Sequence, residues 1–397
     1  MPNTTSGNDR FTNFSLHGLF LVSGGGTVLI GQVLPILAIH FGLNDLELSF
    51  FFPAQFAGSL IGTLMSSHFA RERRHLTAAF AGSASMACGI LMLNAGTFEL
   101  LAAGFFVNGL GIGLTLPSIN VAVLEASPLR GASALSILNF CWGVGAIICK
   151  PFVDLSSRGG NILITTSVFA FFLAAFGASM FVRQIPRPKA EKAGSERADE
   201  ASGPPIWSRP LAWAIALFNF IHVGFESGMA GWLTTYGERL DPEHSAMLLS
   251  PTVGYFFFFI TGRAAAPAIF RYVSENKMLM LGLLTMLAGS IAAITADSIV
   301  TLFAGASLSG LGTSWIFPTN VSRFSRVFGP SATRRATPLF LAGTLGAALS
   351  TWAIGAVSSL GGELRSGMYL LVAGVVILVV VQAGISILTR SNDRPTV

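Results

Sequence analysis

Three charged residues lie inside long apolar stretches of the sequence: Lys150, Glu226 and Arg263. A charge in the middle of a membrane span costs on the order of 2.5–3.5 kcal/mol on insertion scales, so such residues are usually functional. A carboxyl group at that depth can carry a proton, and a cationic group can bind an anion or pair with the carboxyl group. The chemistry that these residues suggest is reversible binding of protons and polar solutes.

The stretch 210–237 carries the most informative pattern. At about 100° per residue, Asn219, His222 and Glu226 share one helical face. Small residues, which permit close approach of another helix, follow the nearly opposite face: Gly224, Gly228, Gly231 and Thr235. The polar face is therefore expected to line a wet cavity, with Glu226 near mid-membrane. We interpret Glu226 and His222 as proton-coupling residues; the alternative is a structural Glu226 bonded to a neighbouring helix.

The stretch 132–157 shows a similar face, formed by Asn139, Gly143, Ala146 and Lys150, with Trp142 and Asp154 at its edges. This face suits a cavity wall. Lys150 also precedes Asp154 by four residues, a spacing at which the two can pair on a helix. Snorkelling of Lys150 to the membrane interface is a third alternative.

Arg263 has three candidate roles: binding an anionic substrate, pairing with Glu226, or snorkelling to the headgroups. Amides bond sugar hydroxyls and indoles cover the apolar face of a pyranose, although both also serve as helix contacts. The predicted substrate-binding residues are Gln32, Asn120, Asn139, Trp142, Lys150, Asn219, Arg263, Trp315 and Asn320.

These residues must be held by membrane helices. Of 397 residues, 52% are apolar and 11% charged, whereas soluble domains carry about 25% charged residues. About 20 apolar residues cross the hydrocarbon core. Twelve runs qualify, at about 14–41, 47–70, 76–95, 98–124, 132–157, 161–182, 210–237, 245–270, 277–296, 299–322, 336–359 and 366–389. The first run is too long for a signal peptide.

The distribution of basic residues predicts the orientation. With the N-terminus in the cytoplasm, most of the 24 lysines and arginines fall on the inner side, and Arg158, Arg239 and Arg365 fall outside. This positive-inside bias predicts cytoplasmic termini in a plasma (bacterial inner) membrane. A polar, Pro-rich stretch at 183–209 is expected to be a cytoplasmic linker. The predicted domains are residues 1–182, 183–209 and 210–397.

An internal repeat relates the two halves. Gly109-Leu110-Gly111 and Pro117 recur 201 residues later as Gly310-Leu311-Gly312 and Pro318. Further glycines recur 200 residues later, and the pairs are Gly24 with Gly224, Gly31 with Gly231 and Gly62 with Gly262. The fold class predicted is an all-α polytopic membrane protein with twelve transmembrane helices in two pseudo-symmetric six-helix halves. Such halves place a binding site at their interface near the bilayer midplane.

With these features the chain resembles the major facilitator superfamily over its whole length. In the loop after the second span, SSHFARERR (Ser66 to Arg74), the basic cluster of the family motif is present, but Ser67 and Ala70 replace its Asp and Gly. Two segments are similar to the fucose–galactose–glucose:proton symporters: LNFCWGVGAIICKP (Leu138 to Pro151) and VGFESGMAGWLTTY (Val223 to Tyr236). The resemblance implies proton-coupled sugar transport.

The catalytic and nucleotide-binding motifs GxxxxGK[ST], HExxH, CxxC and GxSxG do not occur, and six histidines show no metal spacing. We therefore expect no enzyme activity, no cofactor, no metal and no nucleic-acid partner. The prediction is a monomeric secondary active transporter that moves a small polar, sugar-like solute by alternating access in symport with a proton, or with sodium as the coupling ion. Alternatives are efflux of lipophilic compounds by proton antiport, transport of an organic anion, and a non-transporting sensor on the same fold.

Overall fold

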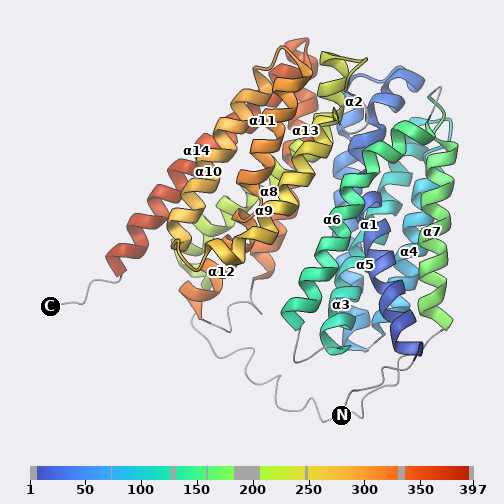
Figure 1. Ribbon diagram of the computed structural model, residues 1–397, viewed down its shortest axis with the longest axis horizontal. Helices are drawn as coiled ribbons and strands as arrows, with labels where there is room; N and C mark the ends of the chain where they lie inside the picture. Colours follow the sequence, from blue (N-terminus) through green and yellow to red (C-terminus); the bar gives the residue numbers. More distant parts are fainter. Residues whose placement is uncertain are drawn as a thin grey trace. The chain divides into compact units, whose positions relative to one another are not determined.

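The computed structural model describes residues 7–72, 74–126, 131–157, 160–182, 206–245, 249–329 and 336–392. Within these ranges the chain forms helices, turns and short loops and no β-strand (Figure 1). The helices are α1 (Gly7–Phe41), α2 (Asp45–Ser49), α3 (Phe51–Arg71), α4 (His75–Met92), α5 (Phe98–Ala126), α6 (Gly131–Ser156), α7 (Leu163–Val182), α8 (Pro210–Leu240), α9 (Pro251–Ile269), α10 (Glu275–Ile294), α11 (Ile299–Thr313), α12 (Ile316–Phe328), α13 (Thr337–Gly361) and α14 (Leu364–Asn392).

Twelve candidate membrane spans occur in the described part of the chain, so the all-helical, twelve-span fold class is confirmed. The second span, Asp45–Ala70, consists of α2 and α3, and the tenth, Ile299–Phe328, consists of α11 and α12. The apolar runs did not indicate these two breaks, because hydropathy does not distinguish a continuous helix from two consecutive ones.

Helix contacts divide the chain into two compact units. Unit 1 contains Met1–Gln184 and Ala230–Phe256, and unit 2 contains Ile185–Met229 and Phe257–Val397. The C-terminal part of α8 and the first turns of α9 therefore pack within unit 1. The predicted halves at 1–182 and 210–397 stay a prediction, because units of packing need not follow units of sequence repeat. Residues 183–205 of the predicted linker lie outside the described residues.

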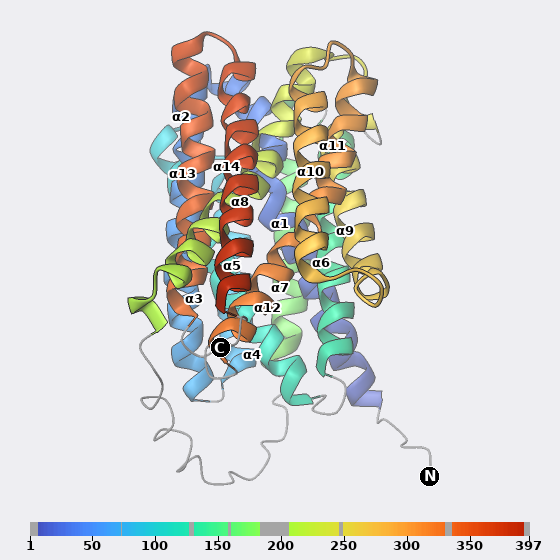
Figure 2. The ribbon, with the colours of Figure 1, turned by 90° about the vertical axis from the view of Figure 1, so that its left-hand side faces the viewer.

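Each unit is built from closely packed helix pairs. In unit 1, α1 packs on α6, α3 and α4 pack on α5, and α4 packs on α7 (Figure 1). In unit 2, α10 lies beside α11 (Figures 1 and 2), and α13 lies beside α14 (Figure 2). Lipid offers no hydrophobic force between helices, so close packing through small residues must supply much of this association.

The internal repeat is visible when the contact between α1 and α6 is compared with the contact between α8 and α13. A Cβ atom on Gly145 of α6 would fall on the carbonyl of Leu21 in α1. A Cβ atom on Gly346 of α13 would likewise fall on the carbonyl of Phe220 in α8. The two glycines are 201 residues apart in the sequence, so the same backbone-to-backbone contact occurs once in each unit.

A second pair of equivalent contacts joins the neighbouring helices. Gly111 of α5 lies against the backbone nitrogen of Met86 in α4, and Gly312 of α11 lies against the backbone nitrogen of Met286 in α10. The residue numbers of the equivalent positions differ by 201 for the two glycines and by 200 for the two methionines. The repeated glycines of the sequence are therefore positions where a side chain would push two helices apart.

We predict that Gly145→Ala and Gly346→Ala each destabilise the protein, by about 1–3 kcal/mol, because the opposing backbone carbonyl cannot move aside as a side chain can. The matched control is Gly384→Ala in α14, where a Cβ atom meets nothing within 4 Å. Thermal unfolding of the detergent-purified variants checks this. Equal midpoints for Gly346→Ala and Gly384→Ala would contradict the packing argument.

Candidate functional site

Glu226 and Arg263 meet in unit 2. Glu226 lies near the middle of α8, a helix of 31 residues, and Arg263 lies in the second half of α9. The Arg263 Nη2 and Glu226 Oε1 atoms are 3.8 Å apart, which is an ion pair longer than a hydrogen bond. The two side chains remain 34% and 23% exposed, respectively. Of the three roles predicted for Arg263, the structure shows the pairing, and the pair is loose and accessible.

Two further contacts hold the guanidinium group of Arg263. Its carbon lies 4.0 Å from the centroid of the Phe259 ring, a cation–π arrangement. Its Nε donates to the backbone carbonyl of Ser314 at 3.0 Å. This carbonyl is free to accept because Pro318, four residues later, has no N–H to donate to it. The break between α11 and α12 thus supplies an acceptor for the arginine.

The polar face of α8 is only partly open. Asn219 is buried, and its Nδ2 donates to the carbonyl of Leu339 at 2.9 Å, which ties α8 to α13. His222 is buried too, and neither ring nitrogen has a hydrogen-bond partner among the described residues. The face is therefore accessible at Glu226 and closed at Asn219 and His222.

Trp315 and Asn320, both predicted to contact substrate, are buried between helices of unit 2. Trp315 Nε1 donates to the carbonyl of Met278 in α10 at 2.9 Å. Asn320 Nδ2 donates to the carbonyl of Ile215 in α8 at 3.3 Å. In this structure both side chains join helices, and a role in substrate binding stays a prediction.

Arg323 follows the predicted span 299–322 directly, and the structure buries it in α12. Its guanidinium donates to Oδ1 of Asn320 and, at 2.6 Å, to Oε1 of Gln382, and it lies over the ring of Phe218 at 4.9 Å. The hydropathy of a run of residues could not show this, because the partners come from three different helices.

Lys150 is 3% exposed and lies between two carboxylates of unit 1. Its Nζ donates to Asp154 on the same helix and, at 2.7 Å, to Oε1 of Glu238 in α8. The next residue, Arg239, pairs with Asp45 at 2.5 Å. Glu238 is 88 residues from Lys150 along the chain, so residue spacing could not indicate this pair. Among the described residues no three His, Cys, Asp or Glu side chains group as a metal site.

The other candidates of unit 1 do not gather around Lys150. Gln32 is buried and its Oε1 accepts from Thr234 at 2.7 Å. Trp142 makes an edge contact with Phe256, with ring centroids 6.4 Å apart. Asn139 is exposed and bonds its own helix, and Asn120 Oδ1 has no partner in the described part of the chain. Their roles as substrate ligands stay predictions.

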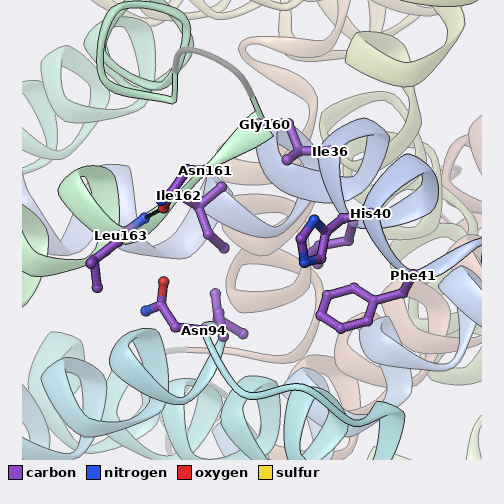
Figure 3. Close-up of a pocket in the computed structure, with 10 residues that line it drawn as sticks. Ile36, His40, Phe41, Asn94, Gly160, Asn161, Ile162 and Leu163 are labelled. Carbon is purple, nitrogen blue, oxygen red and sulfur yellow. Dashed lines mark hydrogen bonds between the residues drawn. The ribbon is translucent and has the colours of Figure 1, made fainter.

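A separate cavity of about 320 Å³ opens at one end of unit 1. It lies among the end of α1, the turn after α4 and the segment before α7 (Figure 3). Its polar lining residues include His40, Asn94 and Asn161, and the ring of His40 faces the space. None of the predicted site residues lines this cavity, so it is distinct from the Glu226–Arg263 pair.

We predict that Lys150→Met destabilises the protein strongly, on the order of 3–5 kcal/mol, because two carboxylates would remain near each other without their cation. Adding Glu238→Gln to Lys150→Met should restore part of the lost stability, because only one carboxylate then remains. The control is Lys277→Met, which removes an exposed lysine. Thermal unfolding in detergent checks the series, and a Lys150→Met midpoint equal to that of the control would refute the prediction.

The chain is similar in sequence or structure to several known transporters. A mouse (Mus musculus) protein, sodium-dependent glucose transporter 1A, is 22% identical in an alignment 369 residues long that covers 80% of this chain and 83% of that protein. A bacterial homologue of the human lysosomal transporter Spinster superposes with a TM-score of 0.79 at 14% identity, covering 99% of this chain and 100% of that one. The E. coli fucose:proton symporter superposes with a TM-score of 0.61 at 17% identity, covering 94% and 98%.

The sequence profile of the Major Facilitator Superfamily matches residues 16–275, which is more than half of the chain. The twelve-span helical fold and the structural similarities agree with this match. The chain belongs to the Major Facilitator Superfamily, a family of membrane transporters and not of enzymes.

Proposed function

We propose that this transporter moves a small polar, sugar-like solute by alternating access, in symport with a proton carried by Glu226. The observation that carries the proposal is the Glu226–Arg263 pair, since it places an accessible carboxyl group near the middle of a membrane helix beside a cation. Because the Arg263 Nη2 and Glu226 Oε1 atoms are 3.8 Å apart, protonation of the carboxylate breaks no direct hydrogen bond between them.

The break in the tenth span supports a solute site at the same place. Transporter sites typically lie near the midplane, where interrupted helices offer backbone groups to ligands. Ser314 offers such a carbonyl, and Arg263 already uses it. Irregular backbone at membrane depth is tolerated only where it is enclosed by protein or lines a cavity.

The similarity to a glucose transporter and to a fucose:proton symporter supports a sugar-like solute. The name of the mouse relative includes sodium, whereas that of the bacterial one includes a proton. We choose the proton because one carboxyl group beside one arginine can bind and release a proton without further ligands. His222, one turn before Glu226, is proposed to assist the proton transfer.

We also infer that the transporter acts as a monomer in the plasma (bacterial inner) membrane with both termini in the cytoplasm. The positive-inside distribution of Lys and Arg supports this orientation. In that orientation Glu238 and Arg239, at the end of α8, lie near the outer face of the membrane.

We predict that Glu226→Gln abolishes accumulation of solute against a gradient but preserves exchange, because glutamine mimics a permanently protonated carboxyl group. Proteoliposomes with an imposed pH gradient provide the test. The probes are D-glucose, D-galactose, L-fucose and the uronic acids of the first two, and proton entry is followed by a dye inside the vesicles.

The matched control is Glu99→Gln, an exposed carboxylate in the first turn of α5 that should leave accumulation unchanged. Accumulation by Glu226→Gln equal to that of the natural protein would show that the proton is carried elsewhere. Solute uptake without any proton uptake in the natural protein would contradict the proposed symport.

A further inference from the structure

Arg263 is held by contacts that leave its two terminal nitrogens without a hydrogen bond to any described residue. A guanidinium group has five N–H donors. One of them, on Nε, donates to the Ser314 carbonyl, and the flat face of the group rests on Phe259. Neither terminal nitrogen makes a hydrogen bond to a described residue, because the Glu226 carboxylate lies 3.8 Å away. The guanidinium is therefore oriented and partly accessible, with its forked end free.

This forked end matches one kind of ligand group. Two parallel N–H donors on a rigid plane bind the two oxygens of a carboxylate at once, and a lysine cannot reproduce that geometry. A neutral hexose carries hydroxyl groups only, so it has no group that fills the fork and compensates the charge. An anionic sugar, such as a uronic acid, has both the hydroxyl groups and the carboxylate.

We propose that the transported solute carries a carboxylate, as a uronic acid does, and that Arg263 binds this group when Glu226 is protonated. The inference rests on the proposed function, because it assigns a substrate class to the same site. Glu226 and the solute are then competitors for one guanidinium group. A proton on Glu226 removes the competitor and leaves Arg263 for the incoming carboxylate.

The net charge of the site explains why proton and anion would travel together. In the empty site the charges of Glu226 and Arg263 cancel. With the anion on Arg263 and the proton on Glu226 the sum is zero again. A proton alone leaves one positive charge and an anion alone leaves one negative charge, which the membrane interior disfavours. Only the empty and the fully loaded forms reorient easily, so one proton accompanies each carboxylate.

Within the described part of the chain, few charged or titratable groups lie near the Glu226 carboxyl group. Among the described residues, Arg263 of α9 is the charged side chain beside Glu226, and His222 of α8 is the other titratable group on that face. The break between α11 and α12 contributes the neutral Ser314. On the other face of α8, which carries Gly224 and Gly228, the side chains of α13 and α14 that pack against it are also neutral: Ser350, Ile354 and Leu371. Protonation of Glu226 should therefore respond chiefly to what occupies Arg263.

The test is calorimetric binding to the purified full chain with two matched pairs of probes, D-glucose with D-glucuronate and D-galactose with D-galacturonate. Each uronate differs from its hexose only in the carboxylate at C6. We expect at least one uronate to bind about tenfold or more tightly than its hexose. Its affinity should rise as the pH falls, by about tenfold per pH unit at most, because binding takes up one proton.

Three variants make the test specific. Arg263→Lys should lose about tenfold or more of the uronate affinity, because the fork is lost while the charge is kept. Glu226→Gln should bind the uronate tightly with no dependence on pH. The control, Arg271→Gln, removes an exposed arginine beyond the end of α9 and should change neither the uronate affinity nor its dependence on pH.

Hexose binding as tight as uronate binding, or no binding of either uronate, would overturn the inference. Uronate binding that does not depend on pH in the natural protein would overturn it as well. The proposed function is judged separately in proteoliposomes. Proton uptake driven by a hexose would support the symport and overturn the carboxylate assignment, whereas uronate uptake without protons would contradict both.

Discussion

A charge inside a membrane span must be compensated by an opposite charge or by hydrogen bonds, because each uncompensated charge costs on the order of 2.5–3.5 kcal/mol at the bilayer centre. The chain meets this constraint in three ways. Lys150 lies between two carboxylates, and Arg323 is surrounded by amide oxygens and an aromatic ring. Glu226 and Arg263 form a partly accessible ion pair at 3.8 Å, and Arg263 is further held by the Ser314 carbonyl and the Phe259 ring. The first two arrangements join helices through hydrogen bonds, whereas we propose that the third exchanges its partners.

The orientation of Arg263 in its pair with Glu226 depends on the local backbone. Pro318 frees the carbonyl of Ser314, and that carbonyl orients Arg263 through its Nε. Phe259 supports the guanidinium from one face. These contacts use the Nε atom and one flat face of the Arg263 guanidinium group. The two terminal nitrogens, Nη1 and Nη2, therefore keep their hydrogen-bonding capacity. Many solutes are moved by proteins of this fold, and the choice among them must come from side chains at the site rather than from the fold itself.

The twelve spans and the repeat could be predicted because both are properties of the chain read in order. An apolar run long enough to cross a bilayer is visible in the sequence, and so is a glycine that recurs after 200 or 201 residues. The contacts Gly145–Leu21 and Gly346–Phe220 give these glycines a physical reason. The pairing of Lys150 with Glu238 and the burial of Arg323 could not be predicted, since they depend on which helices are neighbours. Pro318 was the available signal for the break in the tenth span.

The most direct test of this account is the number of protons taken up when the solute binds. Purified protein in nearly unbuffered solution at about pH 8 would receive D-glucuronate at saturating concentration while the pH is recorded. We expect uptake of about one proton per bound anion, because Glu226 is protonated as Arg263 changes partner. The same addition to Glu226→Gln should take up none. Binding of the anion to the natural protein with no proton uptake would show that Glu226 is not protonated when Arg263 binds the carboxylate.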